Sequence, residues 1–451
     1  MVSLLKLLPW SPLVWLRVAW AWRRCGGSFA FLAEVAALRF SSQTAVLDED
    51  GRLTFAELLG EAEGLAGYFR QLGVRPGQQV GLMCRNHRSF VLGLLALSRL
   101  GADVTPLAPD LPPAVLERHR LDRVVSEQDC LGRFVSPLPR VRAGQLVVLT
   151  SGTTGIAKGV RRRPGLRQLL PIAAALLGGL PLQRRRALIL AIPLYHGYGL
   201  ACLALGLALG APLVLRRRYE IGPLLAGAET GVLVTVPTLL ARWLRSNPVV
   251  PPLSGVITGS APLEAGLCRE LLVRLGPCLY NLYGTSEAGV VALAGPSQLL
   301  QSPGCVGRPL PGNEVRLLEG RILVRGPLAP QGWFETGDLG RWDEHGNLHV
   351  CGRADSMIVS GGENVYPSEL EEAVLLHPGV ADVAVVPVED PDFGRRLVAV
   401  VVGSVGEAEL LQFLRGHLER HKLPRFIRIV EAIPRNALGK VDRTALLRLL
   451  A

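Results

Sequence analysis

The first part of the chain alternates short apolar runs with longer segments of helical periodicity. Residues 45–58 contain Asp50-Gly51, a pair typical of a hairpin turn. Thr54 then precedes a helical pattern that carries Glu57 at its third position, which is the sequence of a capping box. That pattern ends near Gly73, and a strand, an apolar helix and another extended run follow. The alternation predicts an α/β fold with a largely parallel sheet.

A short apolar run in the middle of the chain ends abruptly in a polar loop. Residues 146–149 are apolar, and the next six residues are all Thr, Ser or Gly. This pattern predicts a buried strand that enters a loop with free backbone N–H groups and hydroxyl donors, and Lys158 adds a positive charge. Ala157 stands where a Walker A loop requires glycine. We interpret the segment as a polyphosphate-binding loop; the alternative is a flexible linker.

Three further apolar runs end in segments that suit ligand contacts. Residues 187–200 give a strand followed by an aromatic, glycine-rich turn around His196. Two later strands end at Gly259-Ser260-Ala261-Pro262 and at the run from Tyr283 to Glu287. Exposed backbone at strand ends is where α/β proteins bind their ligands. His196 taken alone is more typical of a packed side chain than of a catalytic one.

Composition limits the classes of protein that fit. The chain has 451 residues, of which 49% are hydrophobic and 19% charged, so it is long enough for two or three domains and is not disordered. Its net charge of +11 includes three arginine triplets, at residues 161–163, 184–186 and 216–218. This charge suits nucleotides, CoA or acidic lipid surfaces, although each triplet alone is also typical of a solvated loop. No nucleic-acid-binding motif accompanies them, so we expect no nucleic-acid partner.

The eight cysteines are never spaced as C-x-x-C and mostly lie among apolar residues. This distribution is typical of reduced, packed thiols and predicts a cytoplasmic protein without disulfides or a zinc site.

The first 24 residues contain four of the seven tryptophans, together with leucine, valine and several basic residues. Their longest uncharged stretch, residues 7–16, is ten residues long and includes Pro9 and Pro12, so it is too short to span a bilayer. Tryptophan with arginine suits the membrane interface. We expect peripheral membrane contact through residues 1–24; the alternative is a packed N-terminal helix.

The motifs taken together resemble those of the adenylate-forming enzymes, which include acyl-CoA synthetases. The loop T-S-G-T-T-G-x-x-K-G is similar to the family's phosphate loop, with Ala157 where the family usually has proline. The Y-G-x-[TS]-E motif, the T-G-D block and a C-terminal G-K turn follow in family order. The resemblance covers roughly residues 40–450 and implies a large N-terminal domain, 25–354, and a mobile C-terminal α+β domain, 355–451. It also implies the co-substrates ATP and CoA, and Mg²⁺.

The resemblance assigns roles to individual residues. Tyr283 would stack on adenine, Glu287 and Thr150 would hold Mg²⁺, and Asp338 and Arg353 would bind ribose or phosphate. Lys440 would neutralise charge during adenylation, although a C-terminal lysine is normally just solvated. The ATP site implied as a whole comprises Thr150, Ser151, Gly152, Thr153, Thr154, Gly155, Lys158, Gly259, Ser260, Ala261, Pro262, Tyr283, Gly284, Thr285, Ser286, Asp338, Arg353 and Lys440. The catalytic residues implied are Lys440, Glu287 and Thr150.

The resemblance further implies a hinge at Asp355 and a pantetheine channel at Gly361 and Gly362. The family commonly has a second acidic residue after the hinge, where this chain has Ser356.

The identity of the acid substrate is the part of the function that the sequence constrains least. In acyl-activating relatives the matching segment lines the acyl pocket, so Tyr195, His196 and Gly199 become candidate substrate contacts. This loop has no carboxylate for an amino-acid amine, and Leu282 stands where malonate-type relatives tend to carry arginine. The apolar run at 200–215 suits either an acyl tunnel or an ordinary core helix and strand.

We therefore expect a CoA ligase for an apolar, medium- or long-chain fatty acid, active in lipid metabolism. The alternatives are a ligase that delivers to a carrier-protein thiol, one that acts on an aromatic or short acid, and a non-catalytic nucleotide- or acyl-binding relative. Retention of both Glu287 and Lys440 disfavours the last of these.

Overall fold

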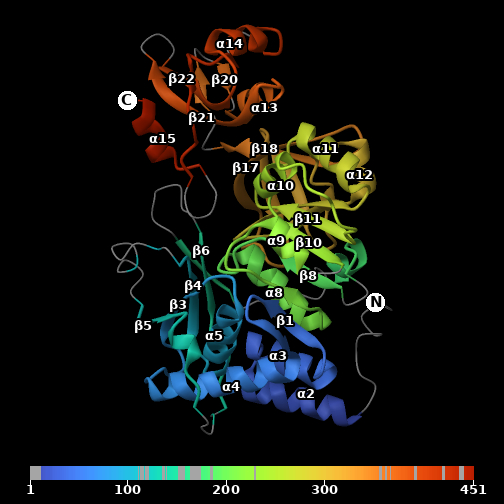
Figure 1. Cartoon of the computed structure of the whole chain (residues 1–451), viewed down its shortest axis with the longest axis vertical. Coiled ribbons are helices and arrows are strands. Elements are labelled where there is room, and N and C mark those ends of the chain that lie inside the picture. Colours follow the sequence, from blue (N-terminus) through green and yellow to red (C-terminus); the bar gives the residue numbers. More distant parts are fainter. Residues whose placement is uncertain are drawn as a thin grey trace.

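The structure is a computed structural model that describes most of the chain. The described residues are 12–109, 111, 116, 121–134, 138, 140–150, 158–162, 174–182, 186–227, 230–354, 358–360, 363–365, 367–390, 394–418, 422–435 and 441–450. Figure 1 places the N-terminal helices and the first parallel sheet at one end of an elongated molecule. The green and yellow elements lie in the middle, and the orange and red elements form the other end.

The first sheet has five strands in the order β5-β3-β4-β6-β7. β3 pairs in parallel with β4 and β5, β4 pairs in parallel with β6, and β7 returns antiparallel to β6. The strands are β3 (Gln79–Met83), β4 (Asp103–Leu107), β5 (Arg123–Ser126), β6 (Leu146–Thr150) and β7 (Lys158–Arg162). The predicted parallel α/β arrangement is confirmed here, with the buried helix α5 (Arg88–Arg99) connecting β3 to β4.

The second sheet has nine strands in the order β14-β13-β12-β11-β10-β8-β9-β1-β2. Every pair from β1 to β12 along this order is parallel, and antiparallel strands close both edges. The strands are β1 (Thr44–Asp48), β2 (Gly51–Thr54), β8 (Ala187–Leu190), β9 (Leu213–Val214), β10 (Gly231–Thr235), β11 (Gly255–Gly259), β12 (Leu279–Thr285), β13 (Gly289–Ala294) and β14 (Arg308–Pro309). Its helices are α8 (Gly197–Leu209), α9 (Ile221–Ala226), α10 (Pro237–Arg245), α11 (Ala265–Leu275) and α12 (Pro296–Gln301).

A four-stranded antiparallel sheet follows, in the order β15-β16-β17-β18. Its strands are β15 (Glu314–Leu318), β16 (Arg321–Arg325), β17 (Phe334–Trp342) and β18 (Leu348–Arg353). β17 and β18 form a hairpin, and Asp343 in its turn accepts hydrogen bonds from the backbone of His345 and Asn347. His349 also contacts Asp343, which makes it part of this turn rather than of a catalytic site.

The C-terminal unit is an antiparallel sheet with helices packed on it. Four strands run in the order β20-β19-β22-β21, and β23 pairs in parallel with β22. The elements are β19 (Ile358–Ser360), β20 (Glu363–Val365), α13 (Pro367–Leu375), β21 (Val380–Asp390), β22 (Gly394–Gly403), α14 (Glu407–Arg415), β23 (Ile427–Ile429) and α15 (Arg443–Leu450). The unit has its own apolar core, which includes Leu370, Val401 and Leu410. The domain boundary expected at Asp355 lies outside the described residues.

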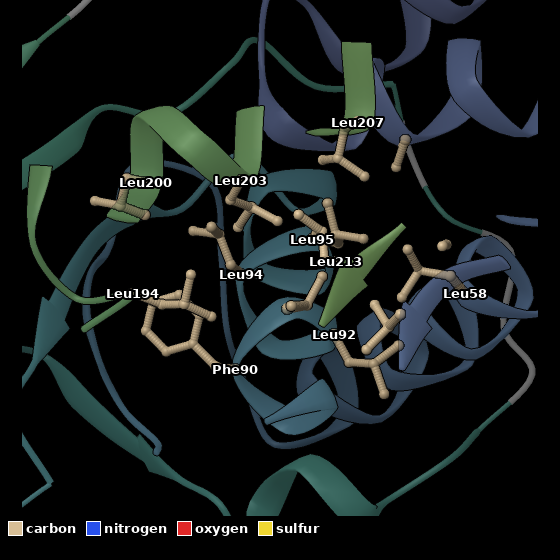
Figure 2. Packing of buried hydrophobic residues seen from close by; sticks show 14 of the residues in the cluster. Leu58, Phe90, Leu92, Leu94, Leu95, Leu194, Leu200, Leu203, Leu207 and Leu213 are labelled. Atoms are coloured by element: carbon tan, nitrogen blue, oxygen red, sulfur yellow. The ribbon is translucent and has the colours of Figure 1, made fainter. Parts of the chain in front are cut away.

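One apolar core joins the first two sheets. It contains residues of α3 (Phe29–Phe40), α4 (Phe55–Gln71), α5 and α8. Figure 2 shows Leu200, Leu203 and Leu207 of α8 directed toward the leucines of α5, with Leu213 of β9 between the helices. These leucines are at most 2% exposed. The apolar run at 200–215 is therefore a core helix and strand, as expected for a helix that is hydrophobic all round.

All eight cysteines are free thiols, as the sequence predicts, and most of them are buried. Cys84 Sγ and Cys130 Sγ lie 3.8 Å apart. Among the described residues, no helix combines the length and hydropathy needed to cross a bilayer.

The capping box predicted at the start of α4 is present. The Thr54 hydroxyl accepts a hydrogen bond from Glu57 N at 3.2 Å, and the Glu57 carboxylate accepts one from Thr54 N at 2.8 Å. α4 packs on α5. By stabilising the start of α4, the cap helps to stabilise the apolar core that the two helices share.

We expect Thr54→Ala to destabilise the protein by about 1 kcal/mol, because the backbone N–H of Glu57 at the helix start loses the hydroxyl that accepts its hydrogen bond. Chemical denaturation followed by circular dichroism measures this change. Thr54→Ser keeps the hydroxyl and serves as the matched control. Equal stability of the Ala and Ser variants would contradict the role of the cap.

Candidate active site

Parallel strands bring the candidate ligand-binding segments to one edge of the nine-stranded sheet. β8, β10, β11 and β12 run in the same direction and in continuous register. Their carboxyl ends therefore lie side by side, and the segments after β8, β11 and β12 all begin at this edge. Two sequence-predicted sites, at 259–262 and 283–287, are neighbours because Gly259 pairs with Leu282.

The segment after β11 has the conformation of a tight, strained turn. Ser260 has a positive φ of 64°, which is uncommon for a residue with a side chain. A Cβ added to Gly259 would approach the carbonyl oxygen of Leu282 to 2.7 Å, so glycine lets these strands lie close together. Ser260 and Pro262 are exposed and Ala261 is half-buried. Local strain of this kind clusters at ligand-binding positions.

A polar row crosses the same edge of the sheet. Thr235, Thr258 and Asn281 are aligned on adjacent strands and are at most 1% exposed. The Asn281 amide donates to Cys305 O at 2.9 Å. The side-chain oxygens of all three residues find no hydrogen-bond partner among the described groups. Buried polar atoms are normally satisfied, so this row marks a place where water or a ligand completes the structure.

Tyr283 and Asp338 join the nine-stranded sheet to the four-stranded one. Tyr283 OH donates to Asp338 Oδ2 at 2.7 Å, and Arg353 Nη1 donates to Asp338 Oδ1 at 3.2 Å. Arg353 also donates to Thr336 O at 3.1 Å, and a Cβ at Gly337 would approach its guanidinium to 2.8 Å. The three predicted side chains therefore form one hydrogen-bonded group, drawn from β12, β17 and β18.

The electrostatics of this group favour a neutral tyrosine. Burial, together with the negative charge of Asp338, raises the pKa of Tyr283 well above its usual value. Tyr283 therefore stays a donor at neutral pH. An ionised carboxylate has about four acceptor positions, and Asp338 accepts from both Tyr283 and Arg353.

Glu287 lies just beyond β12 in a turn that Thr285 stabilises, since the Thr285 hydroxyl accepts a hydrogen bond from Ala288 N at 3.0 Å. A Cβ at Gly284 would overlap Gly289 O, so this strand end needs glycine. Ser286 and Glu287 are half-buried. The Glu287 carboxylate makes no hydrogen bond or ion pair with any residue in the part of the chain that the structure describes.

The environment of Glu287 fits Mg²⁺ held mainly by a substrate. The described residues contain no group of three His, Cys, Asp or Glu side chains that could bind a metal by themselves. Mg²⁺ typically takes one or two carboxylates from the protein and the remaining ligands from phosphates and water. A single uncommitted carboxylate at a strand end is consistent with that chemistry.

The loop after β8 contains two adjacent aromatic side chains, of which Tyr195 is 4% exposed and belongs to the apolar core, and His196 is half-buried. The Tyr195 and His196 rings lie 4.6 Å apart between centroids in an edge-on arrangement. Tyr198 OH donates to Ile257 O at 3.3 Å, which attaches the start of α8 to β11. A Cβ at Gly199 would overlap Pro193 O, so Gly199 permits close backbone packing in this loop.

Asn86 fixes this loop from the first sheet, and sequence reasoning missed it. Its side-chain Nδ2 donates to Ile192 O at 2.5 Å, and its Oδ1 accepts a hydrogen bond from Leu194 N at 2.8 Å. Asn86 is fully buried. It therefore clamps the backbone on both sides of Pro193, immediately before Tyr195. In the sequence, the one feature that could indicate this role is that Asn86 follows shortly after the strand β3.

The strand predicted to enter the phosphate loop is present as β6, and β7 follows the loop. Thr150 and Lys158 are paired across β6 and β7, so the ends of the loop lie opposite each other. The predicted residues Ser151, Gly152, Thr153, Thr154 and Gly155 lie outside the described residues, as do Asp355, Gly361, Gly362 and Lys440.

The flanks of Lys440 are described. Arg435 and Val441 form an antiparallel bridge, and Arg435 binds both carboxylate oxygens of Asp382 at 2.9 Å.

Carboxylates from two parts of the chain meet beside this edge. Burial raises the pKa of Glu264, which precedes α11, to about 7, and the charges of Glu372 and Glu371 on α13 add to the effect. Burial also raises the pKa of Glu371 to about 7. Glu371 and Glu372 of the C-terminal unit therefore lie close enough to Glu264 for their charges to raise its pKa.

Comparison with known proteins identifies the family. The AMP-binding enzyme family matches residues 33–130 and 135–332, and its C-terminal domain matches residues 369–440. The chain belongs to the AMP-binding enzyme family. The recognition made from the motifs is thereby confirmed.

Curated relatives and solved structures refine this assignment. The chain is 28% identical to the 2-succinylbenzoate–CoA ligase of Bacillus licheniformis, over 88% of this chain and 95% of the relative. It is also 28% identical to the Listeria monocytogenes enzyme of the same name, over 90% and 96%. The o-succinylbenzoate CoA synthetase of Bacillus subtilis, solved with an acyl-adenylate intermediate, superposes with a TM-score of 0.82 at 25% identity, over 92% and 97%. These matches confirm the α/β fold and the AMP-forming acid–CoA ligase class.

The expectation of a medium- or long-chain fatty acid, and with it a role in lipid metabolism, is wrong. The relatives named above act on an aromatic acid, the alternative that the sequence left open. The apolar run taken as a possible tunnel forms α8 and β9. Its side chains pack in the apolar core and do not surround a tunnel.

We expect Tyr283→Phe to raise the KM for ATP several-fold while leaving the aromatic face intact, because Asp338 loses its buried donor. Tyr283→Ala removes the ring as well and should raise that KM further. Steady-state kinetics at saturating acid measure both variants. If the KM for ATP were as high in the Phe variant as in the Ala variant, stacking of the ring on adenine would make no separate contribution to binding.

We expect Asn86→Ala to raise the KM for the acid more than the KM for ATP, because it frees the backbone before Tyr195 and leaves buried groups unpaired. Kinetics with each substrate varied in turn measure the difference. Asn281→Ala, which removes another buried amide near the nucleotide segments, is the matched control. Equal effects on both KM values would show that Asn86 acts through general stability only.

Proposed function

We propose that this AMP-forming ligase activates an aromatic carboxylic acid of the substituted benzoate class and transfers it to CoA. The observation that carries the proposal is the loop after β8. Its aromatic side chains Tyr195 and His196 lie in ring contact, and the apolar segment behind them is occupied by core packing. Full-length similarity to 2-succinylbenzoate–CoA ligases supports the same substrate class.

In the first half-reaction the acid carboxylate attacks the α-phosphorus of ATP. A carboxyl O–P bond forms, the bond to the bridging oxygen breaks, and pyrophosphate leaves. The loop from Thr150 to Lys158 would bind the phosphates through backbone N–H groups and hydroxyls, and Lys440 would neutralise charge at the reacting centre. Glu287 and Thr150 would hold Mg²⁺, which lowers the negative charge of the polyphosphate when bound.

The adenosine would lie at the edge formed by β11 and β12. We assign adenine to the ring of Tyr283 and to the backbone of 259–262, and the ribose hydroxyls to Asp338 with Arg353 beside it. The direct hydrogen bonds among these three side chains support the assignment. Gly284, Thr285 and Ser286 complete the turn that carries Glu287.

In the second half-reaction the CoA sulfur attacks the acyl carbon of the adenylate. A thioester forms, the thiol proton passes to solvent, and AMP leaves with the electron pair of the broken carboxyl O–C bond. Rotation of the C-terminal unit about Asp355 would withdraw Lys440 and open a channel past Gly361 and Gly362. Peripheral membrane contact through residues 1–24 is a separate proposal.

We expect acid-dependent pyrophosphate release with Mg-ATP to be fastest with substituted benzoates, slower with benzoate and slowest with fatty acids. Adding CoA should convert the adenylate to acyl-CoA. Lys440→Ala should lower the rate of adenylation by about 10² to 10³, the loss typical of one charge-stabilising donor. Glu287→Gln should raise the Mg²⁺ concentration needed for half-maximal rate. Coupled pyrophosphate release and mass spectrometry of the products measure these changes.

Arg448→Ala, which removes an exposed positive charge from α15, is the matched control for Lys440 and should leave the rate unchanged. Preference for a long aliphatic acid over every aromatic one would refute the proposed substrate. Adenylate that forms but never passes to CoA would instead assign the acceptor to a carrier-protein thiol.

A further inference from the structure

The N-terminal helix α2 (Pro12–Cys25) buries a narrow stripe and exposes large apolar side chains on its opposite side. Ala21 and Cys25 are at most 1% exposed. Trp15, Trp20 and Trp22 are 46%, 51% and 47% exposed, and Leu16 is 67% exposed. We call these four residues the tryptophan face. The packed-helix alternative is thus correct for one side of α2, whereas the tryptophan face stays about half-exposed or more.

Several contacts hold α2 against the body of the protein. Cys25 Sγ donates to Glu34 Oε1 of α3 at 3.0 Å, and Arg24 forms ion pairs with Glu34 and with Glu63 of α4. The Trp22 ring packs edge-on against Phe31, with centroids 5.2 Å apart. The helix is therefore fixed in orientation, and the tryptophan face points outward as part of the folded structure.

The charges beside the tryptophan face are all positive. α2 contains Arg17, Arg23 and Arg24 and no acidic residue. Arg24 is committed to Glu34 and Glu63 and lies 4.5 Å from the centre of the Trp20 ring. Arg17 and Arg23 are exposed and form no ion pair with any residue that the structure describes. Exposed apolar side chains interspersed with uncompensated arginines complement a surface that is both apolar and anionic.

We propose that the tryptophan face docks on an anionic lipid bilayer, with Arg17 and Arg23 at the headgroups. Tryptophan and arginine each combine an apolar body with a polar end, which suits the boundary between headgroups and acyl chains. The 14 residues of α2 extend about 21 Å, less than the hydrocarbon thickness of about 30 Å, so the helix lies along the surface.

The position of α2 leaves the active site accessible in this arrangement. Figure 1 shows α2 at the end of the molecule opposite the C-terminal unit, with the nine-stranded sheet between them. A bilayer against α2 therefore contacts neither the edge that carries Tyr283 nor the C-terminal unit that carries Lys440. Docking would hold the enzyme at the membrane without obstructing catalysis.

The test is sedimentation of the full chain with vesicles of phosphatidylcholine alone and with phosphatidylglycerol added. We expect binding to the anionic vesicles and little to the neutral ones. Trp15→Ser/Leu16→Ser/Trp20→Ser should weaken binding at least about tenfold, because apolar area inserted into the interface is lost. Arg17→Gln/Arg23→Gln should weaken it about fivefold per charge at low salt. Trp22 is left in place because it packs on Phe31.

Matched controls remove the same kinds of side chain elsewhere. Val249→Ser/Val273→Ser/Leu300→Ser removes exposed apolar residues, and Arg242→Gln/Arg245→Gln removes exposed charges of α10; both should bind as the unchanged protein does. Adenylation and thermal stability of the α2 variants should stay unchanged.

No binding by the unchanged protein, or equal loss in the controls, would overturn the proposal. Light scattering that shows self-association abolished by the tryptophan substitutions, without vesicle binding, would assign the face to a second copy instead.

Discussion

The parallel pairing of β8, β10, β11 and β12 is the constraint on which the candidate site depends. Parallel strands deliver their carboxyl ends to one edge, and here that edge receives the aromatic loop, the 259–262 turn and the Tyr283 segment. Gly259 and Gly284 permit the close approach that this alignment needs. The hydrogen bond from Tyr283 to Asp338 then attaches the four-stranded sheet to the same edge. A shift of one strand in register would separate groups that must act together.

The sequence predicts well those features whose cause is local. The capping box at Thr54 and the strand that enters the 150–158 loop each depend on neighbours within a few residues, and both are present as predicted. Asn86 could not be found in this way, because its backbone partners lie more than a hundred residues away and an isolated asparagine is typical of any loop. Its function follows only from the packing of the first sheet against the second.

The acid substrate was misjudged for a related reason. A continuous apolar run indicates burial, but it does not distinguish residues that surround a cavity from residues that fill a core. Leu200, Leu203 and Leu207 fill the core against α5, as Figure 2 shows. That run lacks polar residues because it lies in the interior of the protein. Its composition therefore carries no information about the substrate. The aromatic side chains nearer the strand ends are the more informative signal.

The three groups assigned to the nucleotide belong to three different sheets. The phosphate loop joins strands of the five-stranded sheet, Tyr283 lies on the nine-stranded sheet, and Asp338 lies on the four-stranded one. A nucleotide bound as proposed would act as a removable cross-link between separately hydrogen-bonded bodies. The shared apolar core and the Tyr283–Asp338 hydrogen bond already connect these sheets, and the nucleotide would add a further connection between them. Affinity for ATP would then depend on how the sheets of the N-terminal domain are aligned. A substitution far from the site that tilts one sheet would weaken nucleotide binding.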